Sequence, residues 1–267
     1  MKTILLATLL FICCGLPASA ASLEELTPFF SVQRYTWEEF GGGRRLLKES
    51  GELFSGGVLV GLSTDFSMTL RAKAELFGGV VDYDGETQAP NPLPVETEVN
   101  YVGVKGEFDF GYRASYQALS VEPFAGLGYR WWLRDLEDST AVTRAGIPVP
   151  VSGYTENWFT GYGRLGARGS YRASAELSLF AEGGALYPFY TGNTVDFVGS
   201  GETTFRPRGR VSGFAEAGAY WRQLRLALYY EGFRWDRSPA KSVGDFFFLQ
   251  PESTSDIYGL SVGWNFR

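Results

Sequence analysis

Apolar and polar side chains alternate along most of this sequence. In the stretch TLRAKAEL at positions 69–76, every second side chain is Leu or Ala, and those between them are hydroxyl-bearing or charged. An extended chain with this period of two carries its apolar groups on one face and its polar groups on the other. The pattern recurs in roughly ten segments, which predicts an all-β chain. The predicted strands are residues 28–38, 54–66, 69–81, 101–112, 119–134, 156–171, 175–190, 208–221, 224–235 and 258–266.

The first twenty residues follow a different pattern. Lys2 precedes an apolar run at residues 4–14, and the segment closes with Ala18-Ser19-Ala20. A positively charged start, an apolar middle and small residues at the end are typical of a secretory signal peptide. We therefore predict a signal peptide over residues 1–20, cleaved after Ala20, and one domain over residues 21–267.

The composition excludes several kinds of chemistry. The sequence has no histidine, and its two cysteines both lie in the predicted signal peptide. The mature chain therefore lacks the usual general base, and it can form neither a disulfide nor a zinc–thiolate site. The net charge is −6 for the whole chain, and about −7 once Lys2 is removed, by counting residues. This acidic balance argues against nucleic acid as a partner.

The connections between the predicted strands alternate in length. Short turns are expected near residues 63–67, 113–118, 172–174 and 222–223, and long polar loops near residues 39–52, 83–99, 135–155, 191–206 and 236–255. Such alternation is typical of an up-and-down β-barrel that crosses a membrane. In a water-soluble sheet the apolar face would form the core, whereas in a membrane barrel it faces lipid and the charged face lines the lumen.

Aromatic residues near the strand ends favour the membrane barrel. They lie on the apolar face at two levels, as expected for the aromatic girdles at the two membrane–water interfaces. The sequence thus predicts an all-β, transmembrane, up-and-down antiparallel β-barrel of about ten strands. The predicted girdle consists of Phe66, Tyr112, Tyr171, Trp221, Trp264 and Phe266 near the short turns, and of Trp131, Phe159, Tyr187, Phe189 and Tyr258 near the long loops.

The C-terminal segment YGLSVGWNFR resembles the terminal strand of bacterial outer-membrane β-barrel proteins, although the final aromatic residue is here penultimate. The residues that carry the resemblance are Tyr258, Leu260, Val262, Trp264 and Phe266. The resemblance implies a place in the bacterial outer membrane, contact with its lipid and lipopolysaccharide, and recognition of this strand by the barrel-assembly machinery. It specifies the fold far better than the activity.

Charged residues of both signs occupy the face that would line the lumen. They could line an open channel, or they could form a network of ion pairs, because buried charges must be paired. Inward-facing aromatics such as Phe124, Tyr162 and Trp235 narrow the lumen and favour the paired network. The predicted lumen charges are Arg71, Lys73, Glu75, Lys105, Glu107, Asp109, Glu122, Arg130, Arg134, Arg164, Arg168, Glu176, Glu182, Arg208, Arg210, Glu216, Arg225 and Glu231.

The missing histidine also argues against the outer-membrane proteases, lipid A deacylases, palmitoyltransferases and phospholipases, which depend on histidine. Paired carboxylates such as Glu107 and Asp109 leave a histidine-independent enzyme as the least favoured alternative. We predict a non-enzymatic outer-membrane protein with an ion-paired lumen, long extracellular loops and a structural or surface role. The main alternative is a narrow porin-like channel for ions or small solutes. Neither a metal site nor a cofactor is predicted.

Overall fold

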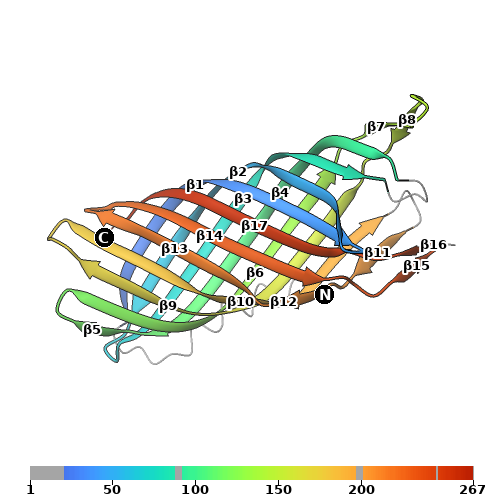
Figure 1. The fold of residues 1–267 in the computed structure, drawn as a ribbon. Helices are drawn as coiled ribbons and strands as arrows, with labels where there is room; N and C mark the ends of the chain where they lie inside the picture. The colour runs from blue at the N-terminus through green and yellow to red at the C-terminus, as the bar shows by residue number, and fades with distance from the viewer. Residues whose placement is uncertain (1–20, 88–91, 197–200, 245, 267) are drawn as a thin grey trace.

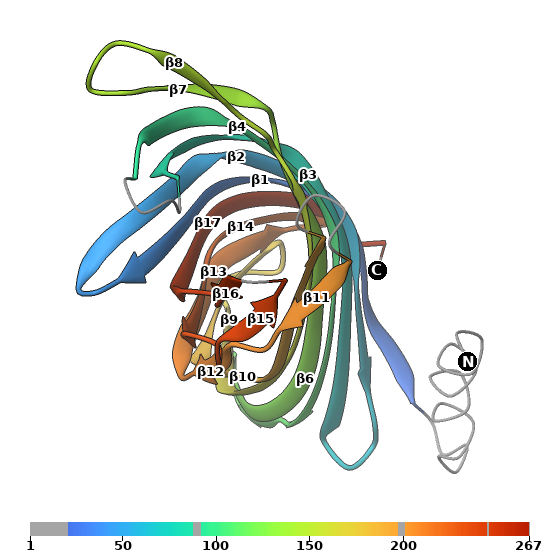
Figure 2. The same cartoon turned by 90° about the vertical axis from the view of Figure 1, so that its right-hand side faces the viewer.

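The protein folds into one closed antiparallel β-barrel of ten long strands, as predicted (Figures 1 and 2). The computed structural model describes residues 21–87, 92–196, 201–244 and 246–266, so the predicted signal peptide lies outside the described residues. Around the barrel the strands are β1 (Ser22–Gly41), β2 (Arg44–Ser63), β3 (Met68–Glu86), β4 (Pro94–Tyr112), β6 (Leu119–Leu136), β9 (Thr155–Arg172), β10 (Leu177–Asp196), β13 (Ser212–Trp221), β14 (Leu224–Asp236) and β17 (Glu252–Trp264).

Shorter strands lie at the two ends of the barrel. One end has short connections and carries β5 (Ala114–Tyr116), whereas two hairpins lie at the other (Figure 1). By the usual topology of such barrels, we name the first end periplasmic and the second extracellular. The remaining short strands are β7 (Ser139–Val142), β8 (Pro148–Val151), β11 (Glu202–Phe205), β12 (Arg208–Arg210), β15 (Lys241–Val243) and β16 (Phe246–Phe248). Within the described ranges, no helix is long and apolar enough to cross a membrane.

The barrel closes because β17 pairs with β1. Directly paired residues, followed once around the barrel from Trp131 in β6, lead back to Leu119 in the same strand, a displacement of 131 − 119 = 12 residues. In barrels generally, such a stagger accompanies a strand tilt of about 35–45°. Ten strands at this tilt enclose a lumen only slightly wider than that of the eight-stranded barrels that side chains can fill.

The apolar face of the barrel points outward. Leu127, Leu165 and Leu228 are each exposed by more than 60%, although leucine is a typical core residue. The charged Glu122 and Arg130, which lie on the same strand as Leu127, are buried instead. A barrel surrounded by lipid has this arrangement, and a water-soluble sheet has the reverse.

The apolar outer face ends well before the strands do. On β1 it runs from Leu26 to Val32, and the next outward side chain, Arg34, contacts Glu52 of β2 at 2.7 Å (Nη1–Oε1). We define such apolar stretches as the membrane-spanning segments. The parts of the long strands beyond them therefore stand above the membrane on the extracellular side.

The predicted long loop at residues 39–52 is wrong, because this segment belongs to strands. β1 continues to Gly41, β2 begins at Arg44, and a tight turn joins them. In that turn Gly42 and Gly43 have φ angles of 59° and 79°, which glycine adopts without strain. Above the membrane the outward side chains are polar, so the chain loses the alternation that identifies a strand in the sequence.

Candidate functional site

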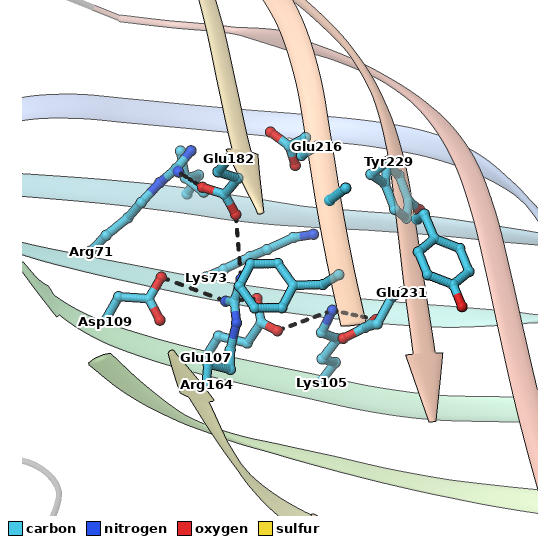
Figure 3. Close-up of a pocket in the computed structure, with 14 residues that line it drawn as sticks. Arg71, Lys73, Lys105, Glu107, Asp109, Arg164, Glu182, Glu216, Tyr229 and Glu231 are labelled. Atoms are coloured by element: carbon cyan, nitrogen blue, oxygen red, sulfur yellow. Dashed lines mark hydrogen bonds and ion pairs between the residues drawn. The ribbon is translucent and has the colours of Figure 1, made fainter. Parts of the chain in front are cut away.

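The lumen at the level of the membrane contains a network of ion pairs (Figure 3). Arg168 contacts Glu122 (Nη1–Oε1, 2.5 Å) and Glu182 (Nε–Oε2, 2.7 Å). Arg164 contacts Glu107 (Nη1–Oε2, 2.7 Å), and its Nη2 lies 3.3 Å from Glu182 Oε1. Because a buried charge is tolerated only when it is paired and hydrogen-bonded, these contacts make the polar interior possible.

Two of the ion pairs cross the lumen. Lys105 on β4 contacts Glu231 on β14 (Nζ–Oε2, 2.7 Å), and Arg71 on β3 contacts Glu182 on β10 (Nη1–Oε2, 2.8 Å) (Figure 3). In the ring of strands β4 and β14 are five positions apart in either direction, so the Lys105–Glu231 pair spans the barrel. The cavity beside these residues has a volume of about 40 Å³. It has room for only a few water molecules, at roughly 10–15 Å³ each.

The structure places the other predicted lumen charges of β3, β4, β13 and β14 in the same region. Their contacts are Lys73–Glu75 (Nζ–Oε2, 3.1 Å), Asp109–Arg168 (Oδ2–Nη2, 3.1 Å) and Arg225–Glu216. Arg130, on β6, is buried, and among the described residues its charge faces aromatic rings and no carboxylate within ion-pair distance. Its guanidinium carbon lies 4.2 Å from the centre of the Phe77 ring, a cation–π contact that partly replaces a carboxylate.

The prediction was wrong for Arg208, Arg210 and Glu176. Arg208 and Arg210 lie on β12 and are exposed on the outer face, because the alternation of faces breaks at Val211 between β12 and β13. Glu176 lies in a short turn at the periplasmic end and is exposed to solvent. A single residue that interrupts a strand moves every side chain before it to the opposite face.

Four tryptophan side chains fill a second level of the lumen, on the extracellular side of the ion pairs. Trp37, Trp132, Trp158 and Trp235, here called the tryptophan layer, are each at most 3% exposed. The centre of the Trp158 ring lies 5.0 Å from that of Trp37, 5.4 Å from that of Trp132 and 6.1 Å from that of Trp235. At such separations aromatic rings are in packing contact. The tryptophan layer therefore closes the barrel just above the membrane.

Sequence reasoning identified only Trp235 of this layer as inward-facing. A signal for two others was present, because Trp132 shares a strand face with Arg130 and Arg134, and Trp158 shares one with Glu156. The alternation along each strand could not predict that these four indoles contact one another. They come from β1, β6, β9 and β14, which only the closed barrel brings together.

A buried ionic cluster adjoins the tryptophan layer. Arg134 contacts Glu49 (Nε–Oε1, 2.9 Å) and Glu156 (Nη1–Oε2, 2.9 Å), and the Tyr101 hydroxyl donates to Glu49. Glu39 is a third carboxylate, without an ion pair to any cation in the described chain. The cluster thus has three carboxylates for one guanidinium.

Glu39 lies on β1 beyond the membrane-spanning segment, and its ionisation is unusual. Burial raises its pKa from 4.5 to about 7, against the opposing attraction of the Arg134 guanidinium. Burial dominates because Arg134 is already bonded to two other carboxylates. A carboxylate with such a pKa is easily switched between charged and neutral forms near neutral pH.

Two larger cavities open at the ends of the lumen. The extracellular cavity, of about 620 Å³, is lined by Glu39 and Glu156 together with the apolar or aromatic Tyr83, Tyr154 and Val195. The periplasmic cavity, of about 930 Å³, is lined mainly by polar and charged groups of the first residues of the barrel and the short turns. The ion-pair network and the tryptophan layer separate the two cavities.

The predicted girdle residues lie on the outer face. Those near the short turns are at least half exposed, and Trp131 at the upper level is half-buried, where its Nε1 donates to Asn157 Oδ1 (2.8 Å). The terminal strand β17 lies between β14 and β1. Its outward side chains are Tyr258, Leu260, Val262 and Trp264, and Phe266 just beyond the strand is exposed as well.

No family model and no curated protein matches this sequence. Among solved structures, the outer membrane protease OmpT from Escherichia coli matches 92% of this chain and 98% of its own chain, with a TM-score of 0.57 and 12% identity. An outer membrane channel from Pseudomonas putida F1 matches 94% of this chain and 99% of its own, with a TM-score of 0.45 and 13% identity. At such identities the comparison concerns the fold alone. In its architecture, this chain is a ten-stranded outer-membrane β-barrel protein.

Proposed function

We propose that this protein is a closed, non-enzymatic barrel that serves a structural or surface role in the outer membrane. The observation that carries the proposal is the double closure of the lumen. Ion pairs such as Lys105–Glu231 span the barrel, and the tryptophan layer fills it again above them. An ion that crossed this barrel would have to displace both, so the parts open to the outside are the extracellular cavity and hairpins.

Single-channel recording in a planar bilayer tests this proposal. The mature chain, refolded in detergent and checked by heat-modifiable gel migration, is expected to give no steady conductance steps. A variant with Trp37→Ser, Trp158→Ser, Lys105→Ser and Glu231→Ser removes side chains from both layers and serves as the conducting control. Steady steps from the unmodified protein would overturn the proposal.

The alternative function is a narrow channel, and the two end cavities favour it. Only a short filled stretch separates about 620 Å³ of space on one side from about 930 Å³ on the other. If steady steps occur, we expect a preference for cations, because four carboxylates and one guanidinium line the extracellular cavity. The reversal potential in a salt gradient measures this preference.

The non-enzymatic part of the proposal is supported by the surroundings of the paired carboxylates. Glu107 accepts bonds from Arg164, Lys105 and Tyr162, so its oxygens are occupied. Asp109 contacts Arg164 and Arg168. A general acid or base must reach its substrate within hydrogen-bond distance. Turnover of any substrate that Glu107→Gln abolishes in a folded barrel would contradict this part.

We also propose that the outer face contacts lipopolysaccharide at the upper aromatic girdle. Arg206 lies over the Tyr190 ring, 5.3 Å from its centre, beside a groove of about 760 Å³ that Phe159 also lines. Arg206 and Arg208, which lies two positions further along the chain, are both exposed, so both can meet phosphate groups. Arg206→Ala/Arg208→Ala should therefore reduce the amount of lipopolysaccharide that co-purifies with the protein.

We also propose that the barrel-assembly machinery recognises the terminal strand β17.

A further inference from the structure

The floor of the extracellular cavity contains a chain of hydrogen bonds that starts at the tryptophan layer. Trp37 Nε1 donates to Glu39 Oε1 (3.0 Å), and Gln250 Nε2 donates to the same oxygen (2.8 Å). Asn193 Nδ2 in turn donates to Gln250 Oε1 (2.9 Å). Glu39, Gln250 and Asn193 are each at most 5% exposed, and all three line the cavity. They come from β1, from the segment before β17, and from β10.

These hydrogen bonds determine which side-chain amide atoms of Gln250 and Asn193 remain without a partner. An ionised Glu39 can only accept, so Gln250 must turn its NH₂ group toward the carboxylate and its oxygen toward Asn193. Asn193 must then turn its own NH₂ group toward Gln250. As a result, Asn193 Oδ1 is buried with no donor from the described part of the chain. Both donors to Glu39, Trp37 and Gln250, reach its Oε1.

The cavity floor is therefore short of donors and of positive charge. In the described part of the chain Asn193 Oδ1 has no donor, although a buried unsatisfied acceptor costs about 1–3 kcal/mol. The carboxylate of Glu39 beside it has no ion pair with a described cation. Arg134, the guanidinium of the adjoining cluster, is already bonded to Glu49 and Glu156. The pKa of Glu39, raised to about 7, has the same cause, since burial removes water and no cation replaces it.

The walls of the cavity are largely apolar. Leu47, Val195 and Phe205 line it, together with the Tyr83 ring. Its volume of about 620 Å³ lies within the range of roughly 300–1,000 Å³ that is common for small-molecule sites. An apolar wall with a few polar groups at one point suits a ligand that has a hydrophobic body and one polar end.

We propose that the extracellular cavity binds a small organic cation, a protonated amine on a hydrophobic body, whose N–H groups donate to Glu39 and Asn193. The ammonium supplies the missing positive charge and the missing donors, and the body contacts the apolar walls. The proposal goes beyond the surface role and depends on it only in that the cavity opens to the cell exterior.

A fluorescence titration with dansylcadaverine tests the site. This probe has an aromatic body, a short alkyl chain and a primary amine that is protonated at neutral pH. Bound to the refolded full mature chain in nonionic detergent, it should show saturable blue-shifted emission. Its N-acetylated analogue, which has no charge, should bind at least tenfold more weakly.

Three variants locate the binding. Glu39→Gln keeps the shape of the side chain and removes its charge, and Asn193→Leu removes the free acceptor; each should weaken binding of dansylcadaverine about tenfold. Glu137→Gln is the matched control and should change binding less than twofold. Glu137 also lines the cavity, but its Oε1 accepts from Asn100 Nδ2 (2.9 Å) away from the chain of hydrogen bonds. Heat-modifiable migration confirms that each variant is folded.

Three results would overturn the proposal: no saturable binding, equal binding of the uncharged analogue, or unchanged binding by both Glu39→Gln and Asn193→Leu. If Asn193→Leu does not fold, Asn193→Ala replaces it. These outcomes are separate from the test of the closed barrel. Conductance steps with intact amine binding would reject closure alone, and a silent barrel without amine binding would reject the site alone.

Discussion

Different kinds of side chain fill the lumen at the level of the membrane and the lumen above it. In the first, ion pairs such as Lys105–Glu231 cross the barrel; in the second, four indoles pack against one another beside the buried cluster around Arg134. Ion pairs depend on individual partners, because removal of one leaves a buried charge. The stabilisation from packed rings depends on their contact area. When one ring is removed, its neighbours can move and recover part of that area. The two regions should therefore respond differently to substitution.

The largest effect is expected from Glu182→Leu in the membrane-level network. Glu182 contacts Arg71, Arg164 and Arg168, so its loss leaves positive charge uncompensated in a buried site. We expect the free energy of unfolding, measured by urea titration in phospholipid vesicles, to fall by about 3–5 kcal/mol.

The control is Glu182→Leu combined with Arg168→Met, which removes a charge of each sign. It should recover part of the loss, because a buried pair can often be replaced by apolar side chains without a large cost. A loss below about 1 kcal/mol in the single variant would show that water, rather than pairing, solvates the network.

In the tryptophan layer, Trp158→Ala should also lower the free energy of unfolding. Truncation of so large a buried side chain usually costs about 3–5 kcal/mol. Trp158 contacts three other rings, which can close over part of the gap, so we expect a value at the lower end. Conductance should stay absent, since the ion pairs below remain. A conducting Trp158→Ala variant would show that the tryptophan layer alone closes the lumen.

The outer surface gives a third contrast, between two apolar residues of similar exposure, one facing lipid and the other facing water. Leu127 is 63% exposed on the membrane-spanning part of β6, and Val142 is 55% exposed on the extracellular hairpin β7–β8. Leu127→Arg should cost about 2–4 kcal/mol of folding free energy in vesicles, as for a basic residue at mid-membrane. Val142→Arg should cost almost nothing. Equal tolerance at both positions would reject the assignment of the lipid-facing surface.

A smaller, pH-dependent effect is expected from Glu39 at the upper edge of the tryptophan layer. Its pKa rises from 4.5 to about 7 on folding, so the folded state binds the proton more tightly than the unfolded state. The associated stability is present below about pH 4.5 and is lost as the pH rises through about 7.

The thermal midpoint of the wild type, followed by gel migration, should therefore fall between about pH 5 and about pH 8 more than that of Glu39→Gln. The groups that face Glu39 are Arg134, Glu49 and Glu156, with Trp37 and Gln250 as donors. An identical pH dependence in both proteins would show that Glu39 is charged throughout this range.

Much of this architecture could be predicted from individual residues. The alternation around Leu127 and Arg130 indicated both the strand and its faces, and the aromatic residues near the strand ends indicated lipid. The first hairpin could not be predicted in the same way. Above the membrane, outward positions such as Arg34 and Glu52 are as polar as those of a loop, so the pattern no longer marks a strand there.

The sequence by itself determined an all-β chain with an apolar outer face and a charged interior, because a period of two is a local property of neighbouring residues. Only the tertiary structure decided which charges meet. Lys105 and Glu231 are 126 residues apart, and the closure of ten strands with a stagger of twelve residues brings them into contact. The same closure gathers the four tryptophans and places the unsatisfied Asn193 Oδ1 and the carboxylate of Glu39 at the cavity floor. Pairing across a lumen depends on ring geometry, which no local pattern encodes.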